Sequence, residues 1–388
     1  MKVLFITDSN AQGGAYVAFV DLVYQVYTKG VDVIVLTGEY NELNRKLKEI
    51  GINSVAAGHR MAMGGLASGI RRPISFLKRW ILYNVCEIKA QNKISNTIDL
   101  SSIDIIHTNS ARNSIGCFIS KKYGIPHIMH IREFADKDFA CVSFRKDYIS
   151  YYNQFTDKFL AVSNAVRDHW INKGIDKDKI LTLYDGVKCD NILLSTDNSK
   201  KDDVLKMVIV GGVVRTKGQH IAVKAISLLP EDIRYKVTLD IVGWVDDKYV
   251  MEMKDFLQKN NISTQIKFLG ARNDVHQILG NYHVGLMCSK SEGFGLVTAE
   301  YMHAQLGVIA SNSGACPELV VNGECGLLFE VGNAKSLADC IETYFRNRDL
   351  LIMHSHEAKG RALSKFTDKI NADKIISTYN ELLVDKTK

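Results

Sequence analysis

The sequence predicts an α/β protein of two domains, each with a parallel sheet covered by helices, and three observations support this fold class. The chain has 388 residues, which at ~150 residues per domain is too many for one compact domain. Short apolar runs alternate with longer stretches of helical periodicity. The runs are rich in Val, Ile and Leu and do not alternate with polar residues. Such runs are typical of strands buried on both faces in parallel sheets covered by helices.

Each half of the chain contains its own series of strand candidates. Those of the first half are 3–7, 31–37, 103–108, 127–131, 159–163 and 180–184. Helical stretches between them include 15–28, 111–123 and 165–172. The strands of the second half are 207–211, 237–242, 265–269, 283–288, 307–310 and 326–329. One parallel sheet with flanking helices is therefore expected in each half.

The polar segment 188–203 (KCDNILLSTDNSKKDD) directly precedes a new strand and is the best linker candidate. We therefore predict domains over 1–190 and 191–365, with a terminal helix over 366–388 that packs back on the first domain. In open parallel sheets the ligand site lies beyond the carboxyl ends of the strands. A binding cleft between the two domains is expected on this ground.

The composition indicates a cytoplasmic protein. No run reaches ~18 uncharged apolar residues, so a transmembrane helix is not expected. The N-terminus is apolar for only five residues before Asp8, which is typical of a buried strand rather than of a signal peptide. The eight cysteines include no C-x-x-C pair and no cluster with histidines, which disfavours a zinc site or a disulfide framework.

The net charge of +6 is concentrated in one segment. Residues 59–93 contain seven basic residues and one acidic residue, which leaves the rest of the chain balanced. Since a nucleic-acid binder usually spreads its excess charge over a wider surface, no nucleic acid is expected as a partner. The segment combines basic residues with apolar residues at helical recurrence, and its candidate membrane or acceptor contacts are Arg71, Arg72, Lys78, Arg79 and Trp80. Such a helix suits an anionic membrane surface; the alternative is a helix packed on its own domain with a solvated basic face.

Two loops after predicted strands favour phosphate binding. Gly13 and Gly14 lie in the first of them, where adjacent glycines let backbone N–H groups approach a phosphate. The loop lacks G-x-G-x-x-G, which disfavours a dehydrogenase, and a tight turn is its simpler interpretation. Arg215 and Lys217 lie in the second loop, where two cations beside a helix N-terminus suit a diphosphate. Solvation of both cations at the surface is the alternative.

Two further loops lie in the second half. Glu292 and Glu300 flank a Gly-Phe-Gly turn that leads from a buried strand into a helix. Carboxylates accept paired hydrogen bonds from vicinal hydroxyls, as in the binding of ribose and hexose rings. Glu300 alone is also explained as a partner of the helix dipole. The loop 311–318 (SNSGACPE) begins the next helix with Pro317 and Glu318 in its first turn.

Together these loops resemble the retaining GT-B glycosyltransferases of family 4. The resemblance is densest over 207–337 and includes E-x7-E at Glu292 and Glu300, R-x-K-G at 215–218, S-x-S-G-x-x-P-E at 311–318 and NGECGLLF at 322–329. The first half matches more loosely, through Gly13-Gly14, DIIH at 104–107, His130 and AVSN at 161–164. The fold that the resemblance implies is GT-B, two Rossmann-like domains with parallel sheets facing across a cleft.

The resemblance also implies roles for individual residues. Glu300 would bind the nucleotide ribose, and Arg272 lies where the family's loop contacts the base. Arg215 and Lys217 would neutralise the diphosphate, which Gly13 and Gly14 would approach from the other domain. The donor sugar and its phosphate would be held by Glu292 and by the backbone of Gly293, Phe294, Gly295 and Leu296. His130 corresponds to the family's active-site histidine near donor and acceptor; a buried core histidine is the alternative.

Two departures from the family pattern stand out. Many members have an arginine five residues before the motif lysine, where this chain has Gly212, and Arg215 is the candidate replacement. The usual Asn-Gly-Val turn is Asp185-Gly186-Val187 here, and we expect no catalytic consequence of this change.

The activity that the resemblance implies is transfer of a hexose, with retention, from a nucleoside diphosphate sugar, UDP being favoured over GDP. No Asp-x-Asp candidate lies at a strand end, so no metal or other cofactor is expected, and cations and helix N-termini would stabilise the leaving group. The expected acceptor is a saccharide, lipid-linked at the inner face of the membrane, in the assembly of a bacterial surface polysaccharide such as capsule or O-antigen. The alternatives are a UDP-sugar 2-epimerase and a catalytically silent partner of a transferase.

Overall fold

The structure, a computed structural model, describes residues 1–8, 13–66, 71–190, 192–195 and 203–387. The chain forms two compact units: unit 1 comprises Met1–Asp185 and Asp368–Lys388, and unit 2 comprises Gly186–Thr367. We predicted the domain boundaries at 190/191 and 365/366. Parts of two predicted segments, residues 10–12 of the first glycine loop and residues 191 and 196–202 of the linker, lie outside the described residues.

Unit 1 contains a parallel sheet of seven strands in the order β3-β2-β1-β5-β6-β8-β9. Its strands are β1 (Lys2–Ile6), β2 (Asp32–Thr37), β3 (Asn53–Ala56), β5 (Ile105–Asn109), β6 (His127–Ile131), β8 (Lys158–Ala161) and β9 (Ile180–Thr182). The six predicted strands are all present, and β3 is the strand of this sheet that the sequence analysis missed. It is short, carries polar Asn53 and Ser54, and lies at the sheet edge, so it lacks the continuous apolar run of a central strand.

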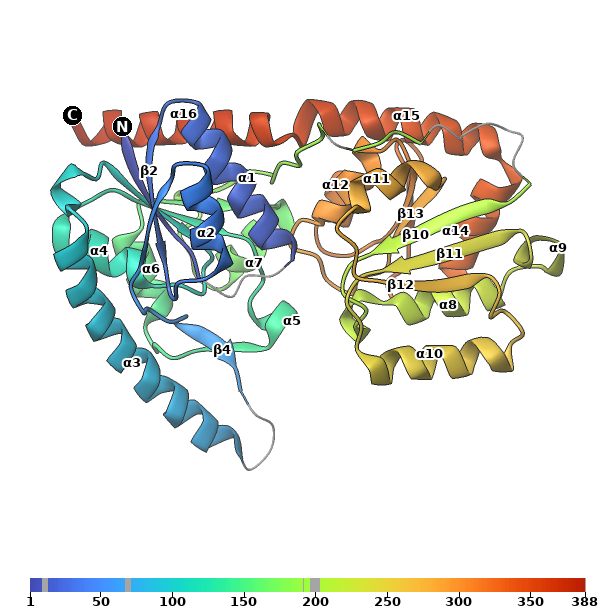
Figure 1. The fold of residues 1–388 in the computed structure, drawn as a ribbon, viewed down its shortest axis with the longest axis horizontal. Helices are drawn as coiled ribbons and strands as arrows, with labels where there is room; N and C mark the ends of the chain where they lie inside the picture. Colours follow the sequence, from blue (N-terminus) through green and yellow to red (C-terminus); the bar gives the residue numbers. More distant parts are fainter. Residues whose placement is uncertain (9–12, 67–70, 191, 196–202, 388) are drawn as a thin grey trace. The chain divides into compact units, whose positions relative to one another are not determined.

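The helices of unit 1 flank this sheet. They are α1 (Gly14–Thr28), α2 (Glu42–Glu49), α3 (Arg72–Thr97), α4 (Ile115–Tyr123), α5 (Asp136–Phe139), α6 (Tyr148–Phe155), α7 (Asn164–Asn172) and α16 (Asp368–Thr387). A small antiparallel pair, β4 (Met63–Gly65) and β7 (Cys141–Ser143), joins the loops beside α3. The C-terminal helix α16 lies beside α1 (Figure 1), where Gln25 donates a hydrogen bond of 2.6 Å to Asp368.

Two predicted boundaries in unit 1 were wrong. The helix expected over 111–123 begins only at Ile115, because residues 110–114 form turns in which the Asn113 side chain accepts a hydrogen bond from the Ile115 N–H (3.1 Å). The strand expected over 159–163 ends at Ala161. Ser163 instead caps α7, with its hydroxyl accepting from the Val166 N–H.

Unit 2 contains a second parallel sheet, with strand order β12-β11-β10-β13-β14-β15. Its strands are β10 (Leu205–Val210), β11 (Val237–Val242), β12 (Ile266–Gly270), β13 (Val284–Met287), β14 (Gly307–Ser311) and β15 (Leu327–Phe329). Its helices are α8 (Gln219–Ser227), α9 (Glu231–Arg234), α10 (Asp247–Lys259), α11 (Val275–Ile278), α12 (Leu296–His303), α13 (Cys316–Leu319), α14 (Ala334–Arg346) and α15 (Arg348–Lys365). All six predicted strands are present, and the predicted fold class, two parallel α/β sheets, is confirmed.

Both sheets have a switch point at which the strand order reverses. In unit 1 it lies between β1 and β5, and in unit 2 it lies between β10 and β13. Loops at the carboxyl ends of strands beside a switch point form the usual ligand site of such sheets. The loops that carry Gly13, Lys217 and Glu292 directly follow β1, β10 and β13, so the topology brings the sequence motifs to these sites.

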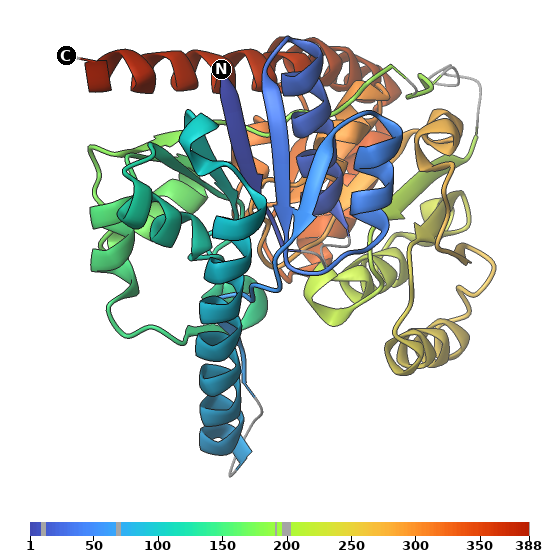
Figure 2. The ribbon, with the colours of Figure 1, turned by 60° about the vertical axis from the view of Figure 1, so that its left-hand side comes forward.

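The basic segment forms α3, which extends away from the sheet of unit 1 in both views (Figures 1 and 2). Only Tyr83, Ala90 and Ile94 of this helix are buried, all in its second half or near its middle. Within the described part of the chain, no helix combines the length and the apolar character needed to span a membrane.

Candidate active site

At the carboxyl ends of β10 and β13 in unit 2, the loop after β10 requires a glycine where it turns. Residues Arg215–Lys217 form a short 3-10 turn that ends at Gly218, whose φ is +74°. A Cβ at Gly218 would lie 2.1 Å from the Cys288 carbonyl oxygen. The glycine of the R-x-K-G motif therefore lets this turn lie directly against the end of β13, where α8 begins.

This close approach brings Lys217 to Glu292, the first glutamate of the E-x7-E motif. The Lys217 ammonium donates to Glu292 Oε1 at 2.5 Å, and the Ser289 hydroxyl donates to the same oxygen at 2.9 Å. The side chains of Glu292 and Lys217 are 13% and 40% exposed, respectively. One cation and one carboxylate thus meet at the switch point and remain accessible from solvent.

The S-x-S-G loop holds the backbone of Glu292 in place. Gly314 has a φ of +56°, and a Cβ there would lie 2.3 Å from the Glu292 carbonyl oxygen. The same oxygen accepts a hydrogen bond from the Ala315 N–H (3.0 Å). The Ser311 and Ser313 hydroxyls donate to the carbonyls of Ser289 (2.7 Å) and Lys290 (2.6 Å). The motif had no predicted role beyond starting a helix, and the structure gives it this supporting one.

Glu300 lies on α12, which begins after Gly295 at a φ of +89°. Its carboxylate contacts the Nε2 of His276 on α11 at 3.2 Å, a partner that sequence analysis did not single out. The first N–H groups of a helix have no partner within the helix and favour an anion nearby. The backbone of residues 293–296 therefore connects the Lys217–Glu292 pair to a helix N-terminus, in agreement with the Gly-Phe-Gly turn predicted to lead into a helix.

The two arginines of the predicted site have other partners. Arg215 pairs with Glu252 of α10 and lies over the Tyr249 ring, 5.3 Å from its centroid. Arg272 forms two hydrogen bonds with Asp274, of 2.8 and 2.5 Å. The structure thus brings Lys217 and Glu292 together, while both arginines lie in local ion pairs on exposed surface.

Trp244 lies beside Gly212, the position at which the family pattern led us to expect an arginine. A Cβ at Gly212 would lie 2.7 Å from the Trp244 ring. The Trp244 carbonyl accepts a hydrogen bond from the Val213 N–H (2.8 Å), which fixes the loop beside the end of β10. The indole is 60% exposed. An aromatic side chain therefore occupies the space beside Gly212 that a larger residue there would need.

His130 lies at the end of β6 in unit 1 and is fully buried. Its Nδ1 faces the Nε2 of His107 at 3.3 Å, and the His107 Nδ1 lies 2.6 Å from the hydroxyl of Tyr379 on α16. Among the described residues the His130 Nε2 has no hydrogen-bond partner. Burial, followed by the nearby Arg132 charge, lowers the pKa of both histidines well below the usual value, so both rings are neutral.

The Tyr379 hydroxyl determines which His130 nitrogen carries the proton. Burial raises its pKa well above 10, so it keeps its proton, and His107 is its hydrogen-bond partner within the described chain. Donation from Tyr379 to the His107 Nδ1 places the His107 proton on Nε2, which donates to the His130 Nδ1. His130 then carries its proton on Nε2 and presents a hydrogen-bond donor there.

Arg132 and Asp185 form a buried ion pair that sequence analysis missed. The Arg132 Nη1 lies 2.5 and 2.6 Å from the two carboxylate oxygens, and its Nε donates to Asn109. Arg132 and Asp185 are only 8% and 4% exposed. Asparagine at position 185 would leave a buried guanidinium without a counter-charge, so the Asp-Gly-Val turn has a structural role. The arginine directly after the strand 127–131 was the available signal.

The remaining predicted residues lie in two places. Gly13 caps α1 with a φ of +90° and has no atom within 4 Å of the Cβ position, while Gly14 is the first residue of that helix. Arg71, Arg72, Lys78, Arg79 and Trp80 are all exposed, at the start of α3 and along its first turns. Within the described ranges, no three His, Cys, Asp or Glu side chains are placed together to hold a metal ion.

Two family models match the chain, "Glycosyltransferase Family 4" over residues 12–191 and "Glycosyl transferases group 1" over residues 192–361. An uncharacterised glycosyltransferase of Methanocaldococcus jannaschii is 27% identical over 324 residues, which cover 79% of this chain and 86% of the relative. A capsular polysaccharide biosynthesis glycosyltransferase of Staphylococcus aureus is 25% identical over 239 residues, which cover 58% of this chain and 61% of that protein. The crystal structure of Anabaena HepE in complex with UDP and glucose is similar with a TM-score of 0.78 at 21% identity, covering 98% of this chain and 100% of that one.

Proposed function

Because the chain belongs to glycosyltransferase family 4 and has its GT-B fold, we propose that it transfers a hexose from a UDP-sugar to a saccharide acceptor with retention of configuration. The observation that carries this proposal is the Lys217–Glu292 pair at the β10/β13 switch point. The presence of UDP and glucose in the HepE structure supports UDP as the nucleotide and a hexose as the sugar.

In this proposal unit 2 binds the donor. Glu300 accepts hydrogen bonds from the ribose hydroxyls, and Glu292 with the backbone of residues 293–296 holds the sugar. Lys217 and the N-terminus of α12 bind the diphosphate, because anions are favoured at helix N-termini beside a cation. Arg215 and Arg272 contact the donor once it binds. Exposed ion pairs like theirs are worth only ~0–1 kcal/mol, so a diphosphate can compete for Arg215 and a base can compete for Arg272.

Lys217 and the helix N-terminus also stabilise the departing diphosphate. Donors fixed before the reaction stabilise charge that develops in the transition state, so the leaving group requires no metal ion here. Unit 1 contributes Gly13 and Gly14 to the diphosphate. It also contributes the N–H of the His130 Nε2, which donates to a hydroxyl of the donor sugar or of the acceptor.

The acceptor is bound by unit 1 and is lipid-linked. In this proposal the exposed basic residues of α3 and Trp80 lie against an anionic membrane surface, and the protein acts at the inner face of the membrane. The similarity to a capsular polysaccharide biosynthesis enzyme favours surface polysaccharide assembly as the process.

The first experiment is a thermal-shift panel of UDP, GDP and ADP and their sugars, with and without EDTA. A rise in Tm with UDP that Glu300→Gln abolishes is the expected result. A rise with GDP or ADP instead would contradict the choice of UDP. Release of UDP only when a saccharide acceptor is added then identifies a transferase, whereas conversion of the UDP-sugar without acceptor identifies an epimerase. No shift with any nucleotide would identify a silent partner.

A further inference from the structure

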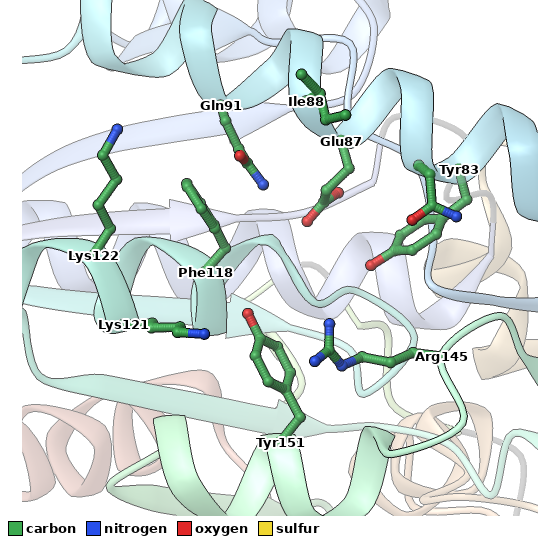
Figure 3. A pocket seen from close by; sticks show the side chains of 10 residues that line it. Tyr83, Glu87, Ile88, Gln91, Phe118, Lys121, Lys122, Arg145 and Tyr151 are labelled. Atoms are coloured by element: carbon green, nitrogen blue, oxygen red, sulfur yellow. The ribbon is translucent and has the colours of Figure 1, made fainter.

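Unit 1 contains a cavity that no residue of the candidate active site lines. Its volume is about 440 Å³, within the ~300–1,000 Å³ typical of small-molecule sites. It lies between the second half of α3, α4, α6 and the loop that carries Arg145 (Figure 3). The cavity is therefore separate from the β1/β5 switch point and requires its own explanation.

Two polar groups in this cavity form no hydrogen bond with the residues that the structure describes. The Glu87 Oε2 is buried and has no hydrogen-bond partner among the described residues. Figure 3 shows the Glu87 carboxyl pointing into the cavity from α3 and the Tyr151 hydroxyl pointing into it from α6. Within the described chain this hydroxyl takes part in no hydrogen bond, although the Tyr151 ring lies 3.7 Å below the Arg145 guanidinium. Buried polar groups are normally hydrogen-bonded, so the Glu87 Oε2 indicates a missing ligand, which the Tyr151 hydroxyl can contact from the other side of the cavity.

The lining is cationic. Lys121 and Lys122 of α4 form no ion pair with a described carboxylate; their ammonium groups lie near aromatic rings, 5.2 Å from the Phe155 centroid and 5.1 Å from that of Tyr123. Glu87 is the one acid among the lining residues described. Burial raises its pKa to about 8, against the opposing charge of Arg145, so at neutral pH this carboxyl is largely protonated and is itself a donor.

The cavity is continuous with an exposed apolar surface of α3. Ile88 lines the cavity and is the last member of a row at helical spacing that is 44–70% exposed. We name this row the α3 apolar face: Ile74, Leu77, Ile81, Val85 and Ile88. An exposed apolar row that ends at a cationic cavity matches a ligand with one hydrocarbon and one anionic part.

We propose that this cavity binds the phosphorylated headgroup of a membrane lipid whose hydrocarbon chain lies along the α3 apolar face. Lys121 and Lys122 bind the phosphoryl oxygens, and the Tyr151 and Glu87 hydroxyls donate to the headgroup. This inference rests on the part of the proposed function that puts α3 on the membrane. It adds a specific lipid site to a helix that would otherwise bind through charge and area alone.

Isothermal titration of the full-length protein at pH 7 tests the proposal with three probes: monomeric dihexanoyl phosphatidylglycerol, glycerol 3-phosphate and inorganic phosphate. We expect the short-chain lipid to bind at least tenfold more tightly than either soluble phosphate, because only the lipid also covers apolar surface. Equal binding of glycerol 3-phosphate or inorganic phosphate would identify a soluble ligand and overturn the proposal. Absence of lipid binding would overturn it as well.

Variants locate the binding. Lys121→Ala/Lys122→Ala should weaken lipid binding at least tenfold, whereas Lys48→Ala/Lys177→Ala, which removes the same charge from exposed positions of unit 1, should leave the Kd unchanged. Tyr151→Phe removes one hydroxyl, keeps the ring, and should weaken binding about threefold to tenfold. Equal losses in the cavity and control variants would show nonspecific attraction and contradict the proposal.

Sedimentation with phosphatidylglycerol/phosphatidylcholine vesicles separates this inference from the proposed function. The cavity variants should still sediment, since the basic residues and the α3 apolar face are unchanged, while losing the short-chain lipid. A wild-type protein that sediments but does not bind the short-chain lipid contradicts only the cavity site. A wild-type protein that does not sediment contradicts the membrane part of the proposed function.

Discussion

The candidate sites of the two units differ in how they hold charge. In unit 2 the Lys217–Glu292 pair is 40% and 13% exposed, and each partner comes from a loop at the sheet edge. In unit 1 Arg132 and Asp185 are 8% and 4% exposed, and His107 and His130 are fully buried. A partly exposed pair costs less to break than a buried pair, in which removal of one partner leaves an uncompensated charge. Substitutions should therefore affect chemistry in unit 2 and stability in unit 1.

The largest expected effect is on stability, at Asp185. Asp185→Asn leaves the buried Arg132 guanidinium without its carboxylate and should cost about 3–5 kcal/mol of unfolding free energy. For a unit of this size that corresponds to a fall in Tm of roughly 10 °C, measurable by calorimetry. The double variant Arg132→Met/Asp185→Leu, which removes both charges, should recover much of the loss. An unchanged Tm for Asp185→Asn would contradict the difference between the units.

The unit 2 pair should show the opposite behaviour. Glu292→Gln and Lys217→Ala should each lower kcat by about 10²–10³, the usual effect of removing one group that stabilises developing charge, and should leave Tm within about 2 °C of wild type. UDP release measured with a saturating acceptor gives kcat. Lys224→Ala, which removes an exposed lysine from α8, is the matched control and should retain full activity. Loss of Tm together with activity would show that the pair is mainly structural.

This difference also explains what the sequence could predict. The unit 2 site is made of residues that lie on three short motifs, and Gly218 and Gly314 are fixed by backbone approaches of 2.1 and 2.3 Å that allow no side chain. Such constraints leave recognisable local patterns, so Lys217, Glu292 and Glu300 were proposed from sequence as candidate site residues. Their partners in the structure were not, because Arg215–Glu252 and Glu300–His276 depend on how α10 and α11 pack.

His130 was a candidate from sequence, but the partners of the buried polar residues in unit 1 had almost no local signal. His107 meets Tyr379 across 272 positions of the chain, and Arg132 meets Asp185 across 53. The strands that carry His107 and His130 were predicted from apolar runs. No sequence pattern, however, identifies the partner of a buried polar side chain on such a run. The same reason applies to the cavity, where Glu87, Lys121 and Tyr151 come from three helices. The periodicity of the sequence does not show how these helices pack together.

A third prediction extends the comparison to the cavity of unit 1. Burial raises the pKa of Glu87 from its usual 4.5 to about 8, so the folded protein holds this proton more tightly than the unfolded chain does. The resulting stability is fully present below pH 4.5 and is lost as the pH rises through 8. At pH 9, Glu87→Gln should therefore have a higher Tm than wild type, and its unfolding free energy should be larger by a few kcal/mol. At pH 5 the two proteins should have similar Tm values. A constant difference across this range, measured by thermal unfolding, would show that Glu87 does not titrate as proposed.

The smallest expected effect concerns the Tyr379–His107–His130 chain, and it tests whether a buried network in unit 1 also serves chemistry. Tyr379→Phe removes the hydroxyl that donates to the His107 Nδ1, so neither tautomer of His107 is favoured and His130 loses its preference for a proton on Nε2. The lost hydrogen bond should cost about 1 kcal/mol of stability. kcat should fall roughly fivefold to tenfold, since a donor present in only part of the molecules contributes less in the transition state.

Nitrogen-15 chemical shifts of labelled histidine measure this tautomer directly. Wild type should show the His130 Nε2 in the protonated range at pH 7, and Tyr379→Phe should shift it towards an average of the two tautomers, whereas Tyr40→Phe, at an exposed tyrosine, should change neither shift nor kcat. A fall in Tm with the His130 shifts unchanged would mean that Tyr379 only packs α16 against unit 1. A changed tautomer with full activity would remove His130 from the reaction and return it to the core. Only a joint change in tautomer and kcat would show that the buried histidines of unit 1 contribute to the transfer, as the Lys217–Glu292 pair of unit 2 does. Their contribution would then be the position of a proton on His130 rather than a charge.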